Sequence, residues 1–365
     1  MAKKPFNPPF LPPNLDYSPV FGKIIKTREI IARYDEAVKR LLNPEIIQRS
    51  FATKEALLSS RIEGTQATLD EVLLYDAKDL KSEENEKEKD YQEIFNYRLA
   101  IKRGKELLEK RPISENLIKE LHKILLNSSR GKNKNPGEFR QNQVFIGPYG
   151  ATIEQATFIP AEPQNIIGLF SNLEKYLNDK EEIDPLVQIA IAHYQFESIH
   201  PFMDGNGRVG RLLVPLFLYE NKVTSHPNIY ISEFLEEHRD VYYELLKNVS
   251  EKEDWIPWIN FFLDAVYEQT SKTFERVEKI EKLYRSLKES MPKVGSIYAN
   301  SLLDAIFVKP TFMVKTIKEI SGISNTQTLY SVIEKFVDLK IIKDITPGSA
   351  RSKIYAFPAL RNIIR

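Results

Sequence analysis

The chain has 365 residues, with 52 Lys and Arg against 51 Asp and Glu, so its formal net charge at pH 7 is +1. The molecule as a whole therefore lacks the excess of positive charge that is typical of proteins that bind nucleic acids or membrane surfaces. The length is sufficient for two or three domains and a substantial core. Cysteine is absent, which excludes disulfides, zinc–thiolate sites and cysteine nucleophiles. The sequence also lacks a signal-peptide run and any apolar stretch of membrane-spanning length, which predicts a cytoplasmic protein without membrane contact.

Five prolines among residues 5–13 disfavour helix at the start of the chain and predict an extended lead-in draped over the body. Beyond it, apolar residues recur at spacings of three and four, which indicates amphipathic helices. The expected helices are 24–42, 44–60, 69–80, 91–109, 114–126, 162–177, 185–199, 232–248 and 255–289. The charged run 81–90 is interpreted as a solvated linker. The sequence therefore predicts a mainly α body.

The second of these helices ends in the segment Ser59-Ser60-Arg61-Ile62-Glu63-Gly64-Thr65. Gly64 is suited to the left-handed conformation that commonly ends a helix. Glu63 is then badly placed, because a carboxylate at a helix C-terminus meets the negative end of the helix dipole. Its position predicts a cationic partner from elsewhere in the chain.

Between the fifth and sixth helices the pattern changes to that of a β-hairpin. Two short apolar runs, 144–146 and 157–159, are separated by turn residues that include Gly147, Pro148 and Gly150. We expect a hairpin here, with an ordinary surface hairpin as the plain alternative to a functional one.

The stretch 200–211 reads His-Pro-Phe-Met-Asp-Gly-Asn-Gly-Arg-Val-Gly-Arg and is followed by an apolar, helix-like run. A glycine-rich turn that feeds a helix N-terminus leaves unpaired N–H groups, which form an anion site. Arg208 and Arg211 lie three residues apart and can grip phosphate oxygens. Asp204 supplies a hard oxygen ligand for phosphate-bound Mg²⁺, and His200 is able to take a proton near neutral pH. The stretch predicts a nucleotide site with a base beside it.

From residue 293 onward the charge balance shifts to eleven Lys and Arg against five Asp and Glu. Helices at 297–306, 314–321 and 327–339 are followed by short strands at 341–345 and 353–357 around a Pro-Gly turn, an order that resembles a winged helix-turn-helix. DNA binding, protein docking and dimer contact all stay open for this region. Asn325, Gln327 and Arg351 are its base-reading candidates.

The stretch 200–211 matches every fixed position of the Fic family signature, H-P-F-x-[D/E]-G-N-G-R-x-x-R. The resemblance implies a mainly α-helical fold and transfer of AMP from ATP to a Tyr, Ser or Thr hydroxyl on target proteins and on the chain itself. It implies that His200 is the general base and that Asp204 holds Mg²⁺. It further assigns an anion hole to Gly205, Asn206 and Gly207, and the β- and γ-phosphates to Arg208 and Arg211.

Three further segments resemble parts of the same family. Ser59-x-x-x-Glu63-Gly64 is similar to its inhibitory motif, which implies that Glu63 reaches into the nucleotide site and pairs with Arg211. The hairpin resembles the family's flap, along which a target segment docks by strand addition. The resemblance places Val144, Phe145, Ile146 and Gly147 toward the nucleotide, and Tyr243, next to Tyr242, near the adenine, with core packing as the alternative for these tyrosines.

The sequence as a whole predicts a Fic-type helical bundle with a β-hairpin flap and a C-terminal winged helix-turn-helix domain. The expected regions are 1–110 with the inhibitory helix, 111–290 as the catalytic core, and 293–365 as the winged-helix-like domain. The expected activity is that of a protein adenylyltransferase that uses ATP and Mg²⁺ and is inhibited by Glu63. The alternatives are a nucleotide-sensing DNA-binding regulator, removal of AMP, and transfer of another phosphorylated group. A homodimer is also left open.

Overall fold

The computed structural model describes residues 4–41, 45–78, 85–128, 130–148, 150–181, 184–346 and 353–365, without side chains at 45–48 and 78. Arg351, the Pro-Gly turn at 347–348 and part of the charged run 81–90 lie outside the described residues.

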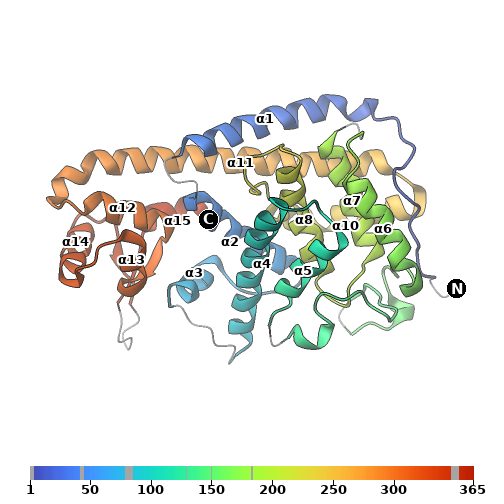
Figure 1. The fold of residues 1–365 in the computed structure, drawn as a ribbon, viewed down its shortest axis with the longest axis horizontal. Helices are drawn as coiled ribbons and strands as arrows, with labels where there is room; N and C mark the ends of the chain where they lie inside the picture. The colour runs from blue at the N-terminus through green and yellow to red at the C-terminus, as the bar shows by residue number, and fades with distance from the viewer. Residues whose placement is uncertain are drawn as a thin grey trace.

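Helices make up most of the described chain (Figure 1). The α-helices are α1 (Phe21–Arg40), α2 (Glu45–Ile62), α3 (Leu69–Lys78), α4 (Glu86–Leu108), α5 (Glu115–Leu125), α6 (Ile166–Leu177), α7 (Pro185–Ile199), α8 (Asn206–Glu220), α9 (Ser232–Glu237), α10 (Arg239–Lys252), α11 (Trp255–Ser290), α12 (Ala299–Val308), α13 (Val314–Ser321), α14 (Thr326–Asp338) and α15 (Pro358–Ile364). The 3₁₀ helices are η1 (Ser18–Val20), η2 (Lys132–Lys134), η3 (Ile153–Gln155), η4 (Pro163–Asn165) and η5 (Met291–Val294). The strands are β1 (Thr311–Met313), β2 (Lys343–Asp344) and β3 (Ile354–Ala356).

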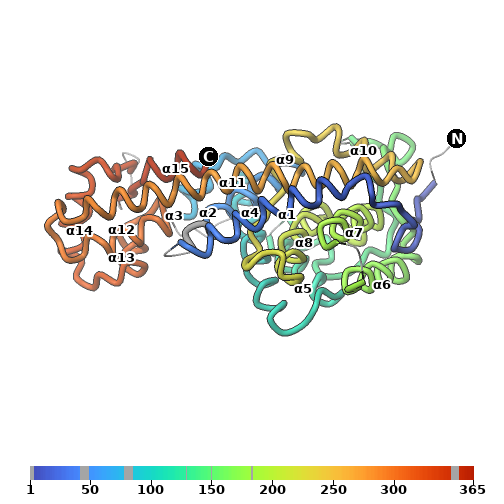
Figure 2. The backbone as a smooth tube through the Cα atoms, turned by 90° about the horizontal axis from the view of Figure 1, so that it is seen from above, coloured from blue at the N-terminus to red at the C-terminus, as the bar shows by residue number. Residues whose placement is uncertain are grey.

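Two helices far apart in the sequence form the spine of the molecule. The helix α11 runs along the length of the elongated molecule, and α1 packs beside it (Figures 1 and 2). The seven-residue spacing of Ile24, Ile31 and Val38 places these buried side chains on one face of α1. At the edge of the contact, Lys23 Nζ lies 2.7 Å from Asp264 Oδ2.

The helix α7 is central, because almost every side chain on it is buried. Its start is fixed by Asp184, whose carboxylate accepts the Leu186 N–H at 2.8 Å. Within it, His193 is 2% exposed, and its Nε2 lies 2.9 Å from the Tyr242 hydroxyl. His193 is thus a core residue. The helix ends directly at His200 and so delivers this residue to the start of α8.

Three sequence predictions are wrong in detail. The charged run 81–90 was interpreted as a solvated linker, but its residues 86–90 form the start of α4. The single helix expected over 232–248 is broken at His238 into α9 and α10. His238 has φ −117° and ψ 35°, outside the helical range, and its ring stacks on Phe234. The two flap strands contract to one antiparallel bridge between Ile146 and Phe158. The remainder of the hairpin contains η3 rather than strand.

In its described residues, the C-terminal region has four α-helices, α12 to α15, and a small antiparallel sheet of order β1-β3-β2, in which Thr311 and Lys343 both pair with Ala356. The strand β1 and the helix α15 were not expected, since three residues are too few to show alternation and α15 begins with a proline. The helix α15 packs against α2 and α11. The winged-helix assignment and the boundary at 293 stay predictions.

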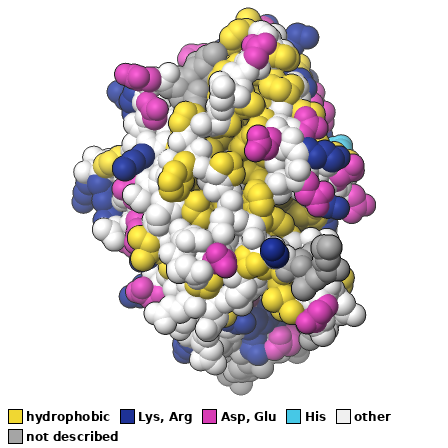
Figure 3. Space-filling view, turned by 90° about the vertical axis from the view of Figure 1, so that its right-hand side faces the viewer, with side chains coloured by type: hydrophobic (Ala, Val, Ile, Leu, Met, Phe, Trp, Pro, Cys, Tyr) yellow, Lys and Arg dark blue, Asp and Glu magenta, His cyan; other side chains and the backbone are white. Residues whose placement is uncertain are grey.

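The N-terminal lead-in is extended and lies on the body, as the prolines predicted. Its Phe6 N–H donates to the Ile159 carbonyl at 2.9 Å, and Leu11 exchanges two hydrogen bonds with Asn172. Figure 3 views the end of the molecule that carries this lead-in and shows hydrophobic side chains gathered along its centre. Within the described part of the chain, no helix is both long and apolar enough to cross a membrane.

Candidate active site

The loop between α7 and α8 holds His200 in an unusual backbone conformation. Its φ of 51° and ψ of 60° lie in the left-handed region, which residues other than glycine rarely adopt. Arg140 stabilises this conformation, because its Nε donates to the His200 carbonyl at 2.8 Å and its backbone N–H donates to the Pro201 carbonyl at 2.9 Å. A strained residue held by its surroundings is typical of a functional site.

The imidazole of His200 is neutral at physiological pH. Burial lowers its pKa to about 4, and the nearby positive charge of Arg140 acts in the same direction, although the carboxylate of Glu63 opposes both. A neutral imidazole is able to accept a proton from a substrate hydroxyl, as a general base must. The structure therefore places His200 in the protonation state that its predicted role requires.

The helix α8 begins at Asn206, with Gly205 in the left-handed region at φ 76° as its N-cap. The side chain of Asn206 closes the preceding loop: its Oδ1 accepts the Phe202 N–H at 2.8 Å, and its Nδ2 donates to the Phe202 carbonyl at 2.9 Å. Asn206 can therefore serve an anion only through its backbone N–H. Together with Gly207, it begins a helix N-terminus that favours negative charge.

Arg211 is directed from α8 toward α2 and is nearly inaccessible, with 2% of its side chain exposed. Its Nε donates to Ser59 Oγ at 2.8 Å, and its Nη2 donates to the Ser59 carbonyl at 2.9 Å. The same Nη2 lies 2.7 Å from Glu63 Oε1. Arg211 is thus the cationic partner that the position of Glu63 predicted.

Glu63 lies over the first turn of α8. It follows the last residue of α2 and precedes Gly64, whose φ of 106° confirms the expected left-handed helix end. A Cβ atom built on Gly207 would lie only 2.3 Å from Glu63 Oε1, so the carboxylate touches the start of α8. Burial opposes ionisation of Glu63, but the charge of Arg211 outweighs it and holds the pKa of this carboxyl below its ordinary value.

Arg208 points toward a different helix from Arg211. Its Nη1 lies 3.1 Å from Glu93 Oε2 on α4, and its Nη2 lies 3.6 Å from Asp204 Oδ1. The two arginines expected to share a face therefore have partners on α4 and α2, respectively. Glu93 was not identified from the sequence, because it lies in a charge-rich stretch 115 positions from its partner.

Asp204 is suited to a metal ion that also binds a phosphate. Its side chain is 45% exposed, and its Oδ1 accepts the Gly205 N–H at 2.6 Å, which orients the carboxylate beside the start of α8. In nucleotide sites, Mg²⁺ usually takes one or two carboxylates and completes its shell with phosphate oxygens and water. Among the described residues, no group of three or more His, Asp or Glu side chains could hold a metal ion without such help. The site thus fits Mg²⁺ bound together with a nucleotide.

The flap and the two tyrosines are the remaining predicted parts of the site. In the flap, Ile146 forms the bridge to Phe158, while Phe145 is 38% exposed. Tyr242 is buried and belongs to the core, whereas Tyr243 is 42% exposed. Burial raises the pKa of Tyr243, and the negative charge of Glu63 acts in the same direction.

Arg140 and His122 were missed as contributors to the site. Arg140 ends the stretch Pro-Gly-Glu-Phe-Arg at 136–140, just before the flap, but its sequence position does not show that its guanidinium binds backbone carbonyls. His122 lies on the buried face of α5, and a polar residue within an apolar stripe was the one available signal. Burial lowers the pKa of His122 to about 4, so this imidazole is neutral as well.

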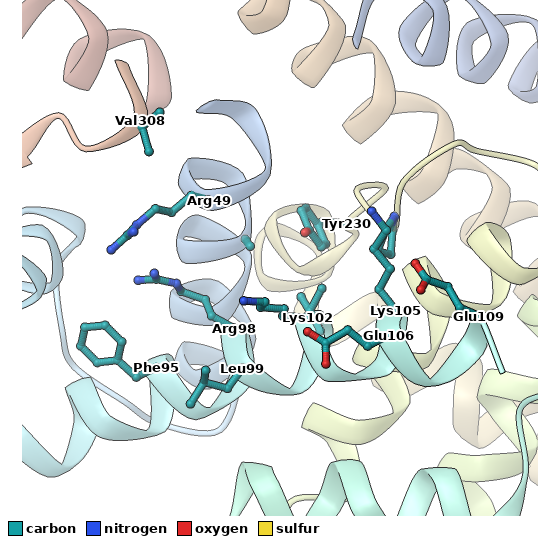
Figure 4. Close-up of a pocket in the computed structure, with 13 residues that line it drawn as sticks. Arg49, Phe95, Arg98, Leu99, Lys102, Lys105, Glu106, Glu109, Tyr230 and Val308 are labelled. Atoms are coloured by element: carbon teal, nitrogen blue, oxygen red, sulfur yellow. The ribbon is translucent and has the colours of Figure 1, made fainter. Parts of the chain in front are cut away.

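A separate hollow of about 570 Å³ lies between α2, α4 and α12 (Figure 4). Its basic side chains include Arg49 and Arg98, which point to the same side and share one carboxylate, Asp76. Its described lining contains none of the residues 200–211. The end of α2 and the start of α8 meet in one site through Glu63 and Arg211. The hollow is separate from that site.

Two family models match the chain. The Fic/DOC family model matches residues 112–218, and the Fic/DOC family N-terminal model matches residues 21–106, so together they span just over half of the chain. The protein adenylyltransferase Fic of Drosophila melanogaster is 32% identical over 192 residues, which are 51% of this chain and 34% of that protein. The Drosophila willistoni protein of the same name has the same identity and coverage. The chain thus spans about a third of the length of these curated relatives.

Solved structures show the same fold. A Fic family protein from Desulfovibrio desulfuricans G20 aligns with a TM-score of 0.61 at 21% identity, over 95% of this chain and 98% of its own. A Fic domain containing signaling protein from Bacteroides thetaiotaomicron gives 0.56 at 22% identity, over 69% and 97%. Fic-1 of C. elegans also gives 0.56 at 22% identity, over 72% and 74%. With both family models and the fold in agreement, the chain belongs to the Fic/DOC family.

Proposed function

We propose that the protein transfers AMP from ATP to a hydroxyl side chain of a target protein. The observation that carries this proposal is a neutral His200 directly before the N-terminus of α8, where Arg211 also lies. A base next to an anion site is what activation of a hydroxyl against a phosphate requires. The names of the curated relatives support the same reaction.

In the proposed step, the hydroxyl oxygen of a Tyr, Ser or Thr attacks the α-phosphorus of ATP while His200 accepts its proton. The new bond joins this oxygen to the α-phosphorus, the bond from the α-phosphorus to the β-bridging oxygen breaks, and pyrophosphate leaves. The backbone N–H groups of Asn206 and Gly207 bind the phosphates, whereas the N–H of Gly205, which the resemblance also assigned to the anion hole, donates to Asp204 Oδ1. Arg211 binds the γ-phosphate once Glu63 has moved, and Arg208 contributes a second cation.

Asp204 would hold Mg²⁺, which neutralises charge on the phosphates when bound. The flap residues Val144, Phe145, Ile146 and Gly147 would lie along the nucleotide and offer backbone groups to the target segment. Tyr243 would contact the adenine. In this proposal Glu63 inhibits the reaction, because one arginine cannot bind both its carboxylate and a phosphate.

The reaction is tested by incubating the purified protein with Mg²⁺ and ATP, GTP, CTP or UTP, each labelled on the α-phosphate. We expect label to enter protein from ATP, and His200→Ala to lower incorporation about a hundredfold or more while ATP still binds. Unchanged labelling by the variant would remove His200 from the chemistry. If label entered protein only from GTP, CTP or UTP, the transferred group would be the monophosphate of that nucleotide instead of AMP.

A further inference from the structure

We propose that His122 is a positioning residue that fixes the Asp204 turn against the flap lead-in, defined as residues 136–140. The inference rests on the proposed function, because Asp204 is its metal ligand and the flap its target-docking element. His122 reaches the nucleotide site only at the backbone of Asp204 and Gly205. It acts through the backbones of the two segments between which it lies.

Both ring nitrogens of His122 bind backbone groups. Nδ1 accepts the Gly137 N–H at 2.8 Å and therefore carries no proton. The proton of the neutral ring must then reside on Nε2, which donates to the Asp204 carbonyl oxygen at 3.0 Å. The tautomer is thus fixed by geometry, and one side chain joins two segments that are 67 residues apart in the sequence.

The ring is held rigidly in this position. It has no exposed surface, and it stacks on Phe202 with a centroid distance of 3.7 Å and an interplanar angle of 10°. It also packs beneath the N-cap of α8, since a Cβ atom built on Gly205 would lie 3.7 Å from His122 Cδ2. A space-filling residue would supply this packing without either hydrogen bond, so the paired nitrogens point to positioning.

A second side chain joins the same two parts of the molecule but avoids Asp204. The guanidinium of Arg140 donates to the carbonyls of Ile199 and His200 on one side and of Asn142 and Ala161, at the two ends of the flap, on the other. Arg140 therefore aligns the flap with the base, whereas His122 aligns the flap lead-in with the metal ligand. The two residues predict different defects when they are changed.

The His122 bond to Asp204 matters because the carboxylate direction depends on its own backbone. Its Oδ1 is already committed to the Gly205 N–H, so the turn and the carboxylate move together. Groups that orient a metal ligand from behind typically affect metal affinity or activity by about 10- to 100-fold. Loss of the Nε2 donor should therefore weaken Mg²⁺ use specifically.

Two amide substitutions separate the two bonds. An Asn side chain reaches the position of Nδ1 and keeps an acceptor for Gly137, but it is too short for Asp204. A Gln side chain reaches the position of Nε2 and keeps a donor for Asp204. Both are made in the His200→Ala protein, in which ATP is not consumed. The Mg²⁺ concentration that half-saturates ATP binding is then measured by calorimetry, with melting temperature as the check on folding.

We expect His122→Asn to raise the half-saturating Mg²⁺ concentration about tenfold or more, and His122→Gln to raise it less than threefold. Arg140→Lys, in the same background, should leave it unchanged, and in the parent it should lower transfer to protein. Equal Mg²⁺ values for the Asn and Gln variants, or a rise with Arg140→Lys that matches the Asn variant, would overturn the inference. Binding is measured without turnover, so the test does not depend on AMP transfer. If the proposed function is wrong, the parent protein binds ATP and Mg²⁺ but incorporates no label into protein.

Discussion

Replacing Glu63 tests whether one carboxylate restrains the site. Glu63→Gly removes both the charge and the volume above Gly207, where Oε1 now lies 2.3 Å from the position of a Cβ atom. Glu63→Gln keeps the volume and removes the charge. If the ion pair with Arg211 is what excludes the γ-phosphate, both variants should be more active than the parent, and Gly more than Gln. If volume alone excludes it, only Gly should be more active.

The size of the effect follows from the geometry of the pair. A hydrogen bond to a charged group contributes about 1.5–3 kcal/mol when it is shielded from water. Arg211 is 2% exposed, but Glu63 is 42% exposed, so screening by solvent reduces the contribution to about 1.4 kcal/mol or less. At that value Arg211 would be unpaired roughly one tenth of the time, and removal of Glu63 would strengthen apparent ATP binding about tenfold.

The assay combines ATP binding by calorimetry with self-labelling from α-labelled ATP. We expect Glu63→Gly to label itself more than tenfold faster than the parent, because ATP is then both bound more tightly and held in line. Its melting temperature should change little, since the pair is half open to water. Adding Arg211→Ala should cancel the gain. A folded Glu63→Gly protein that binds ATP and labels no faster than the parent would refute the inhibitory role.

Three further outcomes follow from carboxylates of the molecule. The pKa of Glu63 is lowered, so its ion pair with Arg211 is fully formed above the ordinary carboxyl pKa and is lost only as the pH falls through the lowered value. The ratio of Glu63→Gly activity to parent activity should therefore be constant from pH 6 to 8. Burial raises the pKa of Glu55 to about 7, so the free energy of unfolding decreases as the pH rises from about 4 to 7. In urea unfolding, Glu55→Gln should make this decrease smaller by about 3 kcal/mol. In Asp204→Ala, Mg²⁺ should no longer increase the affinity for ATP measured by calorimetry. If Mg²⁺ still increases that affinity, a residue other than Asp204 holds the metal ion.

The sequence predicted most of the helices because their burial is periodic. The helix α7 was expected at 185–199 and begins and ends there, since its proline start and its glycine-rich continuation are local signals. The break at His238 and the short strand β1 depend on contacts that periodicity does not encode. The hairpin was located correctly, but the length of its strands was not, because pairing depends on neighbours.

The site was predicted best where its parts are adjacent in the sequence. His200, Asp204 and Arg211 fall within one stretch, and the structure brings Glu63 onto Arg211 as its helix-end position required. The partner of Arg208 was not predictable, because nothing local selects Glu93 from among 51 acidic residues. Such a pairing is decided by the fold.

We expect Ser59 to act beyond the proposed inhibitory pair of Glu63 and Arg211. It is fully buried, and it accepts Arg211 Nε on its hydroxyl and Nη2 on its carbonyl, so Arg211 would stay anchored to α2 if Glu63 turned away. An anchored guanidinium is pre-organised for the γ-phosphate. Ser60 is an apt control, because it is equally buried and its hydroxyl has no hydrogen-bond partner.

In the Glu63→Gly protein, Ser59→Ala should therefore weaken ATP binding about tenfold, which corresponds to one lost hydrogen bond to a charged group. Ser60→Ala should leave it unchanged. In the parent, Ser59→Ala should relieve little, because Glu63 and the Ser59 carbonyl still hold Arg211. If Ser59→Ala in the Glu63→Gly protein binds ATP as tightly as Glu63→Gly alone, Ser59 serves inhibition only, and α2 contributes nothing to the active state. If binding weakens as expected, the helix that blocks the site also builds it, which means that activation requires Glu63 to turn away while α2 stays in place.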